Sequence, residues 1–282
     1  MLSSFKRFIK RGISSGVLLA AKTRVGNYAL GEALNSVMAT QRSVTHKNTQ
    51  LIFTVPNRLN RYRVDSFSSK EPETLDWIDQ IPESAVLWDI GANIGLYSCY
   101  AAKSRKCKVY AFEPSVFNLE LLARNIFIND LVKQVVIVPL PLSNSIKTSS
   151  LNMTSTEWGG ALSTFGENFG DDGKALNKIF SFSTVGLTMD QAVNLLKIPE
   201  PTHIKMDVDG LEHLILSGGG GVLNKISELA IEVNEDFEEQ VMNVAALCEK
   251  AGLVFKEKKH SEMFDNNERF GNTYNQVWYR PK

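Results

Sequence analysis

The chain has 282 residues, of which 43% are hydrophobic and 22% charged, a composition that is typical of a folded globular protein and excludes a disordered chain. Its three cysteines form no C-x-x-C pair, which argues against a disulfide scaffold and a zinc ribbon and favours a reducing, cytoplasmic compartment. No run of 18 apolar residues occurs, so we expect no transmembrane helix.

Charge is unevenly distributed along the chain. Residues 1–64 hold eleven Lys and Arg and one acid, whereas the remaining residues hold twenty bases and thirty acids, a net charge of −10. Residues 1–31 contain no Asp or Glu, and apolar residues such as Phe5 and Ile9 recur there at helical spacing, which predicts a helix that ends near Gly12. Three roles stay open for this basic arm. We prefer packing on its own domain or on a second subunit of a homo-oligomer; peripheral attachment to the inner face of a membrane and a cleaved signal are the alternatives.

The segment after the arm is more extended. Apolar residues at 51–55 predict one strand, and the pattern at 62–67 suggests another. Pro72 and the acidic Glu73 then open a helix that runs through Ile78, because proline and carboxylates suit the first turn of a helix. We expect this helix to lead into the main domain.

Strands and helices alternate from residue 86 onward. Because strand–helix–strand units place successive strands parallel, this alternation predicts an α/β fold with a Rossmann-like, doubly wound, mostly parallel sheet of seven strands. No helical pattern separates the last two strands, so we expect an antiparallel final strand. The helical and extended N-terminal segment is an extension to this sheet. The predicted strands are 86–90, 109–112, 134–138, 203–208, 229–233, 253–256 and 276–279, and the predicted helices are 96–102, 116–128, 211–216 and 238–251.

Two segments and an insertion follow from this pattern. We divide the chain into a basic helical arm, residues 1–50, and one domain, residues 51–282. Residues 143–201 are an insertion between the third and fourth strands, because the interval is too long for one crossover helix. Five glycines lie within 159–173, beside Trp158, and glycine-rich loops at a cleft commonly act as lids. We therefore expect a lid whose aromatic rings face a sugar; an ordinary hairpin is the alternative.

The loop from Asp89 to Gly95 follows a strand and opens a helix, which is the position of a nucleotide-binding loop. It does not meet the dinucleotide pattern G-x-G-x-x-G, because Asn93 and Leu96 stand at two of the glycine positions. The carboxylate of Asp89 also disfavours a pyrophosphate. S-adenosylmethionine has no phosphate and carries an ammonium and a sulfonium, so an acidic loop favours it. Gly91 and Gly95 allow the backbone to approach such a cofactor closely.

A second acid supports this cofactor. Glu113 follows Asp89 by 24 residues, at the end of the next strand, where a carboxylate can accept hydrogen bonds from both ribose hydroxyls. Such sheets bind ligands at the carboxyl ends of their strands. Residues that follow the second and third strands are therefore further candidates for cofactor binding. The predicted cofactor-binding residues are Asp89, Gly91, Asn93, Gly95, Glu113, Pro114, Leu142 and Ser143.

The fourth and fifth strands supply the candidates for proton transfer. Lys205 lies within a strand and needs a buried partner, for which Glu232 and Asp89 are candidates. An alcohol acceptor must lose a proton, which requires a positioned base. Asp207 is our first choice, with Glu232 and His213 as alternatives, and Asp207 could instead contact the cofactor.

A divalent metal is a further alternative at this end of the fourth strand. Asp207, Asp209 and Glu212 are oxygen ligands of the kind that Mg²⁺ prefers. Our primary expectation includes no metal.

Four motifs together resemble the FkbM-type methyltransferases, S-adenosylmethionine-dependent enzymes of the seven-strand Rossmann-like class. The resemblance spans roughly residues 50–280, although Asp209 stands where the family usually has Glu, so it receives no role by analogy. The resemblance implies methyl transfer, commonly to a hydroxyl of a sugar or natural product. The motifs are 71–74 with Trp77 and Ile78, 89–98, 112–115, and 205–210 followed by Glu212.

The acceptor implied by this resemblance is a small molecule or a glycan. We expect no nucleic-acid substrate, because the main domain is acidic and lacks an Asn-Pro-Pro-Tyr signal. Two other functions stay open, a binding module without catalysis and a nicotinamide-dependent oxidoreductase.

Overall fold

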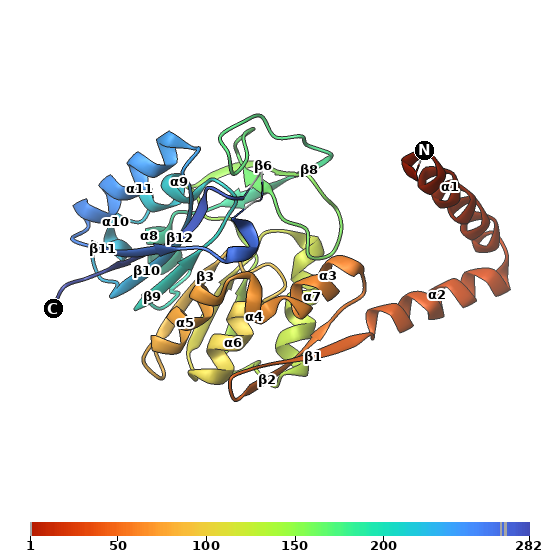
Figure 1. The fold of residues 1–282 in the computed structure, drawn as a ribbon, viewed down its shortest axis with the longest axis horizontal. Coiled ribbons are helices and arrows are strands. Elements are labelled where there is room, and N and C mark those ends of the chain that lie inside the picture. The colour runs from red at the N-terminus through yellow and green to blue at the C-terminus, as the bar shows by residue number, and fades with distance from the viewer. Residues whose placement is uncertain (1, 266, 268–269) are drawn as a thin grey trace.

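The computed structural model describes every residue except 1, 266, 268 and 269. Its body is a layered α/β domain, from which two N-terminal helices project to one side (Figure 1). These helices are α1, Leu2–Ala21, and α2, Arg24–Met38. No helix in the described part of the chain is long and apolar enough to cross a membrane.

A seven-stranded sheet forms the centre of the body, in the order β11-β12-β10-β9-β3-β4-β5. The five strands from β10 to β5 pair in parallel, and β12 is antiparallel to both of its neighbours. The predicted fold class and the antiparallel final strand are therefore confirmed. The strands are β3 Val86–Ile90, β4 Lys108–Phe112, β5 Val135–Val138, β9 His203–Met206, β10 Glu228–Asn234, β11 Val254–Lys259 and β12 Thr273–Tyr279.

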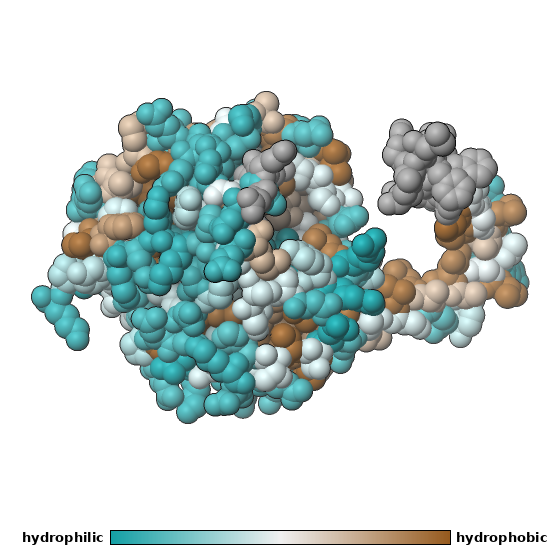
Figure 2. Space-filling view, viewed as in Figure 1, coloured by the Kyte–Doolittle hydropathy of each residue, from teal (hydrophilic) through white to brown (hydrophobic). Residues whose placement is uncertain are grey.

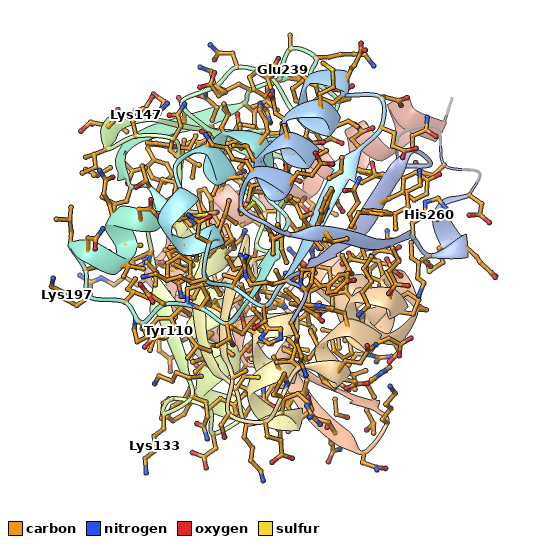
Figure 3. The ribbon with its side chains drawn as sticks, turned by 90° about the vertical axis from the view of Figure 1, so that its left-hand side faces the viewer. Tyr110, Lys133, Lys147, Lys197, Glu239 and His260 are labelled. Carbon is orange, nitrogen blue, oxygen red and sulfur yellow. The ribbon has the colours of Figure 1, made fainter. Side chains whose placement is uncertain are left out.

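Helices cover both faces of this sheet, because alternate residues of the central strands point to opposite sides. In β3, Leu87 packs in the core cluster that holds Ile78 and Leu122, whereas Trp88 and Ile90 pack in the other cluster. Figure 3 shows the same layers from the side, with side chains filling the space between them. One layer contains α5 Pro72–Gln80, α6 Leu96–Ser104 and α7 Val116–Ile128; the other contains α8 Met189–Asn194, α9 Glu212–Ser217, α10 Gly220–Leu223 and α11 Glu238–Lys250.

The N-terminal extension differs from its sequence prediction in two places. The helix predicted to end near Gly12 continues unbroken as α1. The predicted strand at 62–67 is helical, because Asn57 caps a helix by accepting a hydrogen bond from the Asn60 backbone N–H at 2.8 Å. The helices concerned are α3 Arg58–Asp65 and α4 Phe67–Lys70.

A hairpin joins the arm to the body. The C-terminal end of α7 holds this hairpin. Asn129, the C-cap of α7, accepts a hydrogen bond from the backbone N–H of Ile52 at 3.0 Å, and Asn125 accepts one from that of Thr54 at 2.8 Å. The proposed division at residue 50 lies inside its second strand. The hairpin consists of β1 Gln41–His46 and β2 Thr49–Thr54.

The two helices of the arm, α1 and α2, do not pack on their own domain, which corrects our preferred expectation for a single chain. Of the described side chains in α1 and α2, only Met38 is buried, and it contacts Ile94 and Leu121 of the body. The two helices contact each other and otherwise extend into solvent (Figure 1). Packing on a second subunit stays a prediction.

The insertion forms a small antiparallel sheet of its own, in the order β7-β6-β8, which lies beside the carboxyl ends of the main strands (Figure 1). It is thus larger than a simple hairpin. Its central strand pairs along its whole length with β8, from Lys147 to Met153. The strands are β6 Lys147–Met153, β7 Ser163–Phe165 and β8 Phe180–Gly186.

Candidate active site

A cavity of about 400 Å³ opens at the carboxyl ends of β3, β4, β9 and β10. It lies at the switch point between β3 and β9, where the order of the strands along the chain reverses and sheets of this kind bind ligands. The N-terminal extension and the insertion close its sides. The polar residues of its lining are Tyr62, Arg63, Lys70, Glu71, Glu73, Asn93, Tyr97, Glu113, Asn118, Ser163, Lys205, Asp207, Asp209, Glu232, His260, Thr273 and Asn275.

The loop after β3 requires glycine for steric reasons. Gly91 has a φ of +86°, and a Cβ atom there would lie 1.8 Å from the carbonyl oxygen of Asp207. Gly95 has a φ of +84° at the N-terminus of α6, where a Cβ would lie 2.4 Å from the Leu122 side chain. Gly91 therefore brings the first loop against the loop after β9, and Gly95 allows α6 to begin against α7.

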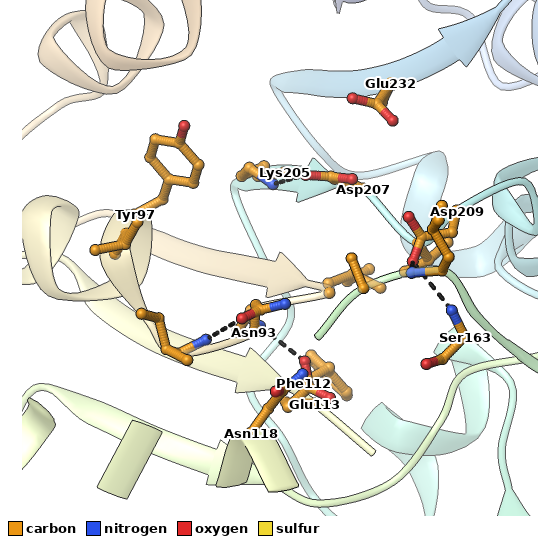
Figure 4. Close-up of a pocket in the computed structure, with 18 of the residues that line it drawn as sticks. Asn93, Tyr97, Phe112, Glu113, Asn118, Ser163, Lys205, Asp207, Asp209 and Glu232 are labelled. Carbon is orange, nitrogen blue, oxygen red and sulfur yellow. Dashed lines mark hydrogen bonds and ion pairs between the residues drawn. The ribbon is translucent and has the colours of Figure 1, made fainter. Parts of the chain in front are cut away.

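Glu113 is the carboxylate at the end of β4, and it faces this loop (Figure 4). Its two oxygens accept hydrogen bonds from the backbone N–H groups of Asn93, at 2.8 Å, and Ser115, at 2.7 Å. Burial raises its pKa to about 7, although these two donors act in the opposite direction. A carboxylate has about four acceptor sites, so Glu113 retains the capacity to bind two hydroxyl groups.

Two asparagines fasten the insertion over this part of the cavity. The side chain of Asn118 accepts a hydrogen bond from the Gly159 N–H and donates one to the Gly160 carbonyl, both at 3.0 Å. Asn93 donates a second bond to the same carbonyl at 2.9 Å. The glycine-rich segment therefore forms a wall of the cavity, as a lid would. Asn118 was not predicted from the sequence, because a single Asn within a helix carries no signal until its partners are known.

The aromatic residues of the insertion take different positions from those expected. Phe165 lines the cavity, but Trp158 packs beside Ile94 and Leu121, and Phe169 packs on Phe237 with ring centroids 5.5 Å apart. A ring that stacks on a sugar thus stays a prediction for Phe165 alone.

A network of charged side chains lies at the opposite wall. The ammonium of Lys205 is 3.1 Å from a carboxylate oxygen of Asp207 and 5.1 Å from the ring centre of Tyr97. Its ion-pair partner is therefore Asp207, not Glu232 or Asp89 as expected. Burial opposes the charge on Lys205, but Asp207 and Asp89 outweigh it and raise the Lys205 pKa above its ordinary value.

The extension adds a second ion pair, between Lys70 and Glu71. Burial disfavours the charged form of Glu71, yet Lys70 and Lys205 lower its pKa to about 2, so it is ionised at neutral pH. The sequence analysis used Glu71 only as part of a family motif. The position of Glu71, just before the helix that leads into the domain, could have marked it as a cavity residue.

Glu232 lies in the same part of the cavity as Asp207 (Figure 4). Burial raises the pKa of Glu232 well above its ordinary value, and the charges of Asp207 and Glu71 raise it further. This raised pKa favours the protonated form of Glu232, while the carboxylate of Asp207 faces the Lys205 ammonium.

The predicted site residues divide into two groups. Four lie outside the cavity lining. Gly95 shapes the start of α6; Asp89 is buried on the α6 face of the sheet, where it accepts a hydrogen bond from the Ser98 hydroxyl. Ser143 is buried and its backbone N–H donates to the carbonyl of Leu187 at 2.7 Å. The predicted residues that line the cavity are Gly91, Asn93, Glu113, Pro114, Leu142, Asp207 and Glu232.

His213 is the fourth residue that the structure leaves outside. Its ring packs edge-on against Phe237, with centroids 5.5 Å apart, and it is absent from the cavity lining. Burial lowers its pKa, so the imidazole is neutral. The helix that carries His213 turns this side chain into the layer beside α11, which the spacing of the sequence could not reveal.

The alternative of a magnesium site is not supported. Asp209 accepts hydrogen bonds from the backbone of Leu162 and Ser163 at 2.6 and 3.3 Å. Glu212 lies outside the cavity lining and accepts them from Val208 and Gly210 at 2.9 and 3.1 Å. Across the described residues, no group of three or more His, Cys, Asp or Glu could hold a metal ion.

Comparisons with known proteins agree with this geometry. A family model of the methyltransferase FkbM domain matches residues 89–266. The chain is 27% identical over 188 residues to the hexuronic acid methyltransferase AglP of Haloferax volcanii, a match that covers 64% of this chain and 70% of that protein. It is 37% identical over 75 residues to the methyltransferase sdnD of Sordaria araneosa, covering 26% of this chain and 29% of that protein.

A solved structure supports the fold. The methyltransferase FkbM from Methylobacillus flagellatus KT superposes with a TM-score of 0.51 at 13% identity, over 78% of this chain and 52% of that one. The chain therefore spans about half the length of that structure, and the likeness concerns the fold alone.

The first prediction concerns Glu113. Replacing it by Gln removes the negative charge and one acceptor oxygen, so the affinity for S-adenosylhomocysteine should fall about 10- to 100-fold, equivalent to about 1.5–3 kcal/mol. Isothermal titration calorimetry measures this change. Glu120→Gln is the matched control, since Glu120 is exposed on the helix that follows Glu113, α7, and pairs with Arg124. Equal affinities in the wild type and Glu113→Gln would show that Glu113 does not bind the cofactor.

Proposed function

The chain belongs to the FkbM methyltransferase family and depends on S-adenosylmethionine, and from this premise we propose that it methylates a hydroxyl group of a sugar, in a glycan or in a secondary metabolite. The observation that carries the proposal is a single cavity, in which the glycine loop and Glu113 lie at one wall and Asp207 and Glu232 at the other. Family membership excludes the nicotinamide-dependent oxidoreductase. A binding module without catalysis stays the alternative.

The cavity residues fit S-adenosylmethionine. Gly91 lines the cavity and presents only backbone to a ligand, and Glu113 keeps acceptor capacity for the ribose hydroxyls. Carboxylates outnumber cations in the lining, which favours a ligand with positive charges. When bound, this cofactor supplies an electrophilic methyl group on a sulfonium. Gly91, Asn93, Glu113, Pro114 and Leu142 are the residues that we propose for its binding.

Asp207 is the residue that we propose as the proton acceptor. Its carboxylate is 27% exposed and lines the cavity, so an acceptor hydroxyl can reach it. The Lys205 ammonium, 3.1 Å away, orients this carboxylate at the cavity wall. Burial raises the pKa of Glu232 well above its ordinary value, which favours its protonated form and suits it to donate a hydrogen bond to a sugar oxygen.

A sugar acceptor is supported by chemistry and by one relative. The wall around Asp207 offers several hydrogen-bonding side chains from the extension and the last strand, including Glu73, His260 and Asn275. Sugar hydroxyls need such a polar wall. The relative AglP is a hexuronic acid methyltransferase, so a uronic acid is the first acceptor to test.

The second prediction is the activity itself. Incubation with S-adenosylmethionine and a panel of neutral sugars, uronic acids and their glycosides should yield a product heavier by one methylene unit, detected by mass spectrometry. Release of S-adenosylhomocysteine should rise with the acceptor concentration. The panel should include simple phenols and amino sugars as controls. Cofactor binding without transfer to any hydroxyl would instead favour the binding module.

The third prediction separates the two carboxylates. Asp207→Asn keeps the shape but cannot take a proton, so the turnover number should fall about 10²- to 10⁴-fold, while cofactor affinity changes by less than about threefold. Glu232→Gln is the matched control on the next strand. Because Gln resembles the protonated acid, this variant should retain most of the turnover. A loss of turnover in Glu232→Gln but not in Asp207→Asn would move the base to β10, and a loss of cofactor affinity in Asp207→Asn would assign Asp207 to the cofactor.

A further inference from the structure

We propose that Arg63 binds a carboxylate inside the cavity, an inference that deepens the proposed function and rests on it. Three long-chain cations line the cavity among the described residues. Lys70 is paired with Glu71, and Lys205 with Asp207. Arg63 forms no ion pair with any carboxylate in the described part of the chain.

The position of Arg63 suits an anion. Its Nε–H donates a hydrogen bond to the Gly159 carbonyl at 2.9 Å, which fixes the plane of the guanidinium. The two terminal amino groups then remain for a ligand, and a planar guanidinium binds carboxylates in bidentate fashion. Arg63 is half-buried, so a bond formed there is less screened than one at the surface.

Two carboxylates can occupy this place during the proposed reaction. One belongs to the methionine end of S-adenosylmethionine, and the other would belong to a uronic acid acceptor. The chemistry of recognition is the same for both. S-adenosylhomocysteine, the product formed from the cofactor, carries the methionine carboxylate but no uronic acid. Its binding therefore separates the two sources.

The fourth prediction tests this site with Arg63→Gln, measured by calorimetry with S-adenosylhomocysteine and by acceptor kinetics. If Arg63 holds the cofactor carboxylate, affinity for S-adenosylhomocysteine should fall at least tenfold. If it holds the acceptor carboxylate, that affinity should stay unchanged, and KM should rise at least tenfold for a uronic acid but not for the neutral parent sugar. Arg61→Gln is the control, because Arg61 is exposed on the same helix and outside the cavity lining.

Arg63→Lys keeps the charge but loses the planar guanidinium, so it should show an intermediate effect. The melting temperatures of all variants reveal whether loss of the Gly159 contact destabilises the protein. Unchanged affinity and unchanged KM in Arg63→Gln would overturn the proposal. Weaker S-adenosylhomocysteine binding in a protein that methylates no sugar would support the Arg63 site while contradicting the sugar acceptor.

A separate observation concerns the arm, for which we infer a docking surface for an anionic lipid membrane. Figure 2 shows apolar side chains on the projecting helices, away from the body. In the described chain, a third of the exposed large hydrophobic residues fall within 13–37, a small part of its length. Their exposed fractions range from 42% to 80%. They are Ile13, Val17, Leu18, Leu19, Val25, Tyr28, Leu34 and Val37.

The charge of the arm selects the partner. Residues 1–31 contain six Lys and Arg and no acid. Apolar side chains beside basic residues on a helix match the boundary between acyl chains and anionic headgroups, where both kinds of side chain gain free energy together. Contact with a second copy of the chain is an outcome of the test below.

The fifth prediction uses the full chain and vesicles of phosphatidylglycerol mixed with phosphatidylcholine. The wild type should sediment with these vesicles, less so with phosphatidylcholine alone, and high salt should release it because screening shortens the attraction. Leu18→Asp with Leu19→Asp should reduce binding at least tenfold. Leu195→Asp with Leu196→Asp is the matched control, since this exposed pair lies on the body.

Two outcomes would overturn the membrane proposal. The first is a wild-type protein that does not sediment with anionic vesicles. The second is an arm variant that binds vesicles normally but has a smaller oligomer size by light scattering, which would assign the arm to a second subunit.

Discussion

The close contact between Gly91 and the carbonyl of Asp207 sets the geometry of the site. A Cβ atom at Gly91 would lie 1.8 Å from that oxygen, so only glycine permits this distance between the loops after β3 and β9. These loops carry the two halves of the chemistry. One leads to Asn93, which positions Glu113 through a backbone hydrogen bond, and the other carries Asp207. In the proposed function, the cofactor and the acceptor therefore meet at the centre of the sheet.

Around this contact, the buried charges compensate one another. Removing charges from water is costly, and oppositely charged partners offset that cost only at short range. Lys205 stands between Asp89 on the neighbouring strand and Asp207 at the cavity, and the Lys70–Glu71 pair reaches the same cluster from the extension. The charges of Asp207 and Glu71 add to burial in raising the pKa of Glu232. In the proposed function, Asp207 accepts a proton while Glu232 donates a hydrogen bond.

The outer walls of the cavity come from segments beyond the common sheet. The turn at Trp158 and Gly159 is held by three side chains, Asn60 and Arg63 of α3 and Asn118 of α7. This arrangement couples the extension to the insertion across the opening.

The sequence by itself determined the α/β architecture, because the period of apolar residues and the glycine loop are local signals. The bounds of β3 and α7 agree with the predictions, and Glu113 and Asp207 lie in the cavity as expected. Only the tertiary structure decided which face each side chain occupies. It turned Asp89 toward Ser98, buried His213 against Phe237, and paired Lys205 with Asp207. These outcomes depend on which layer covers each strand, and contacts between residues far apart in the chain leave no local pattern to read.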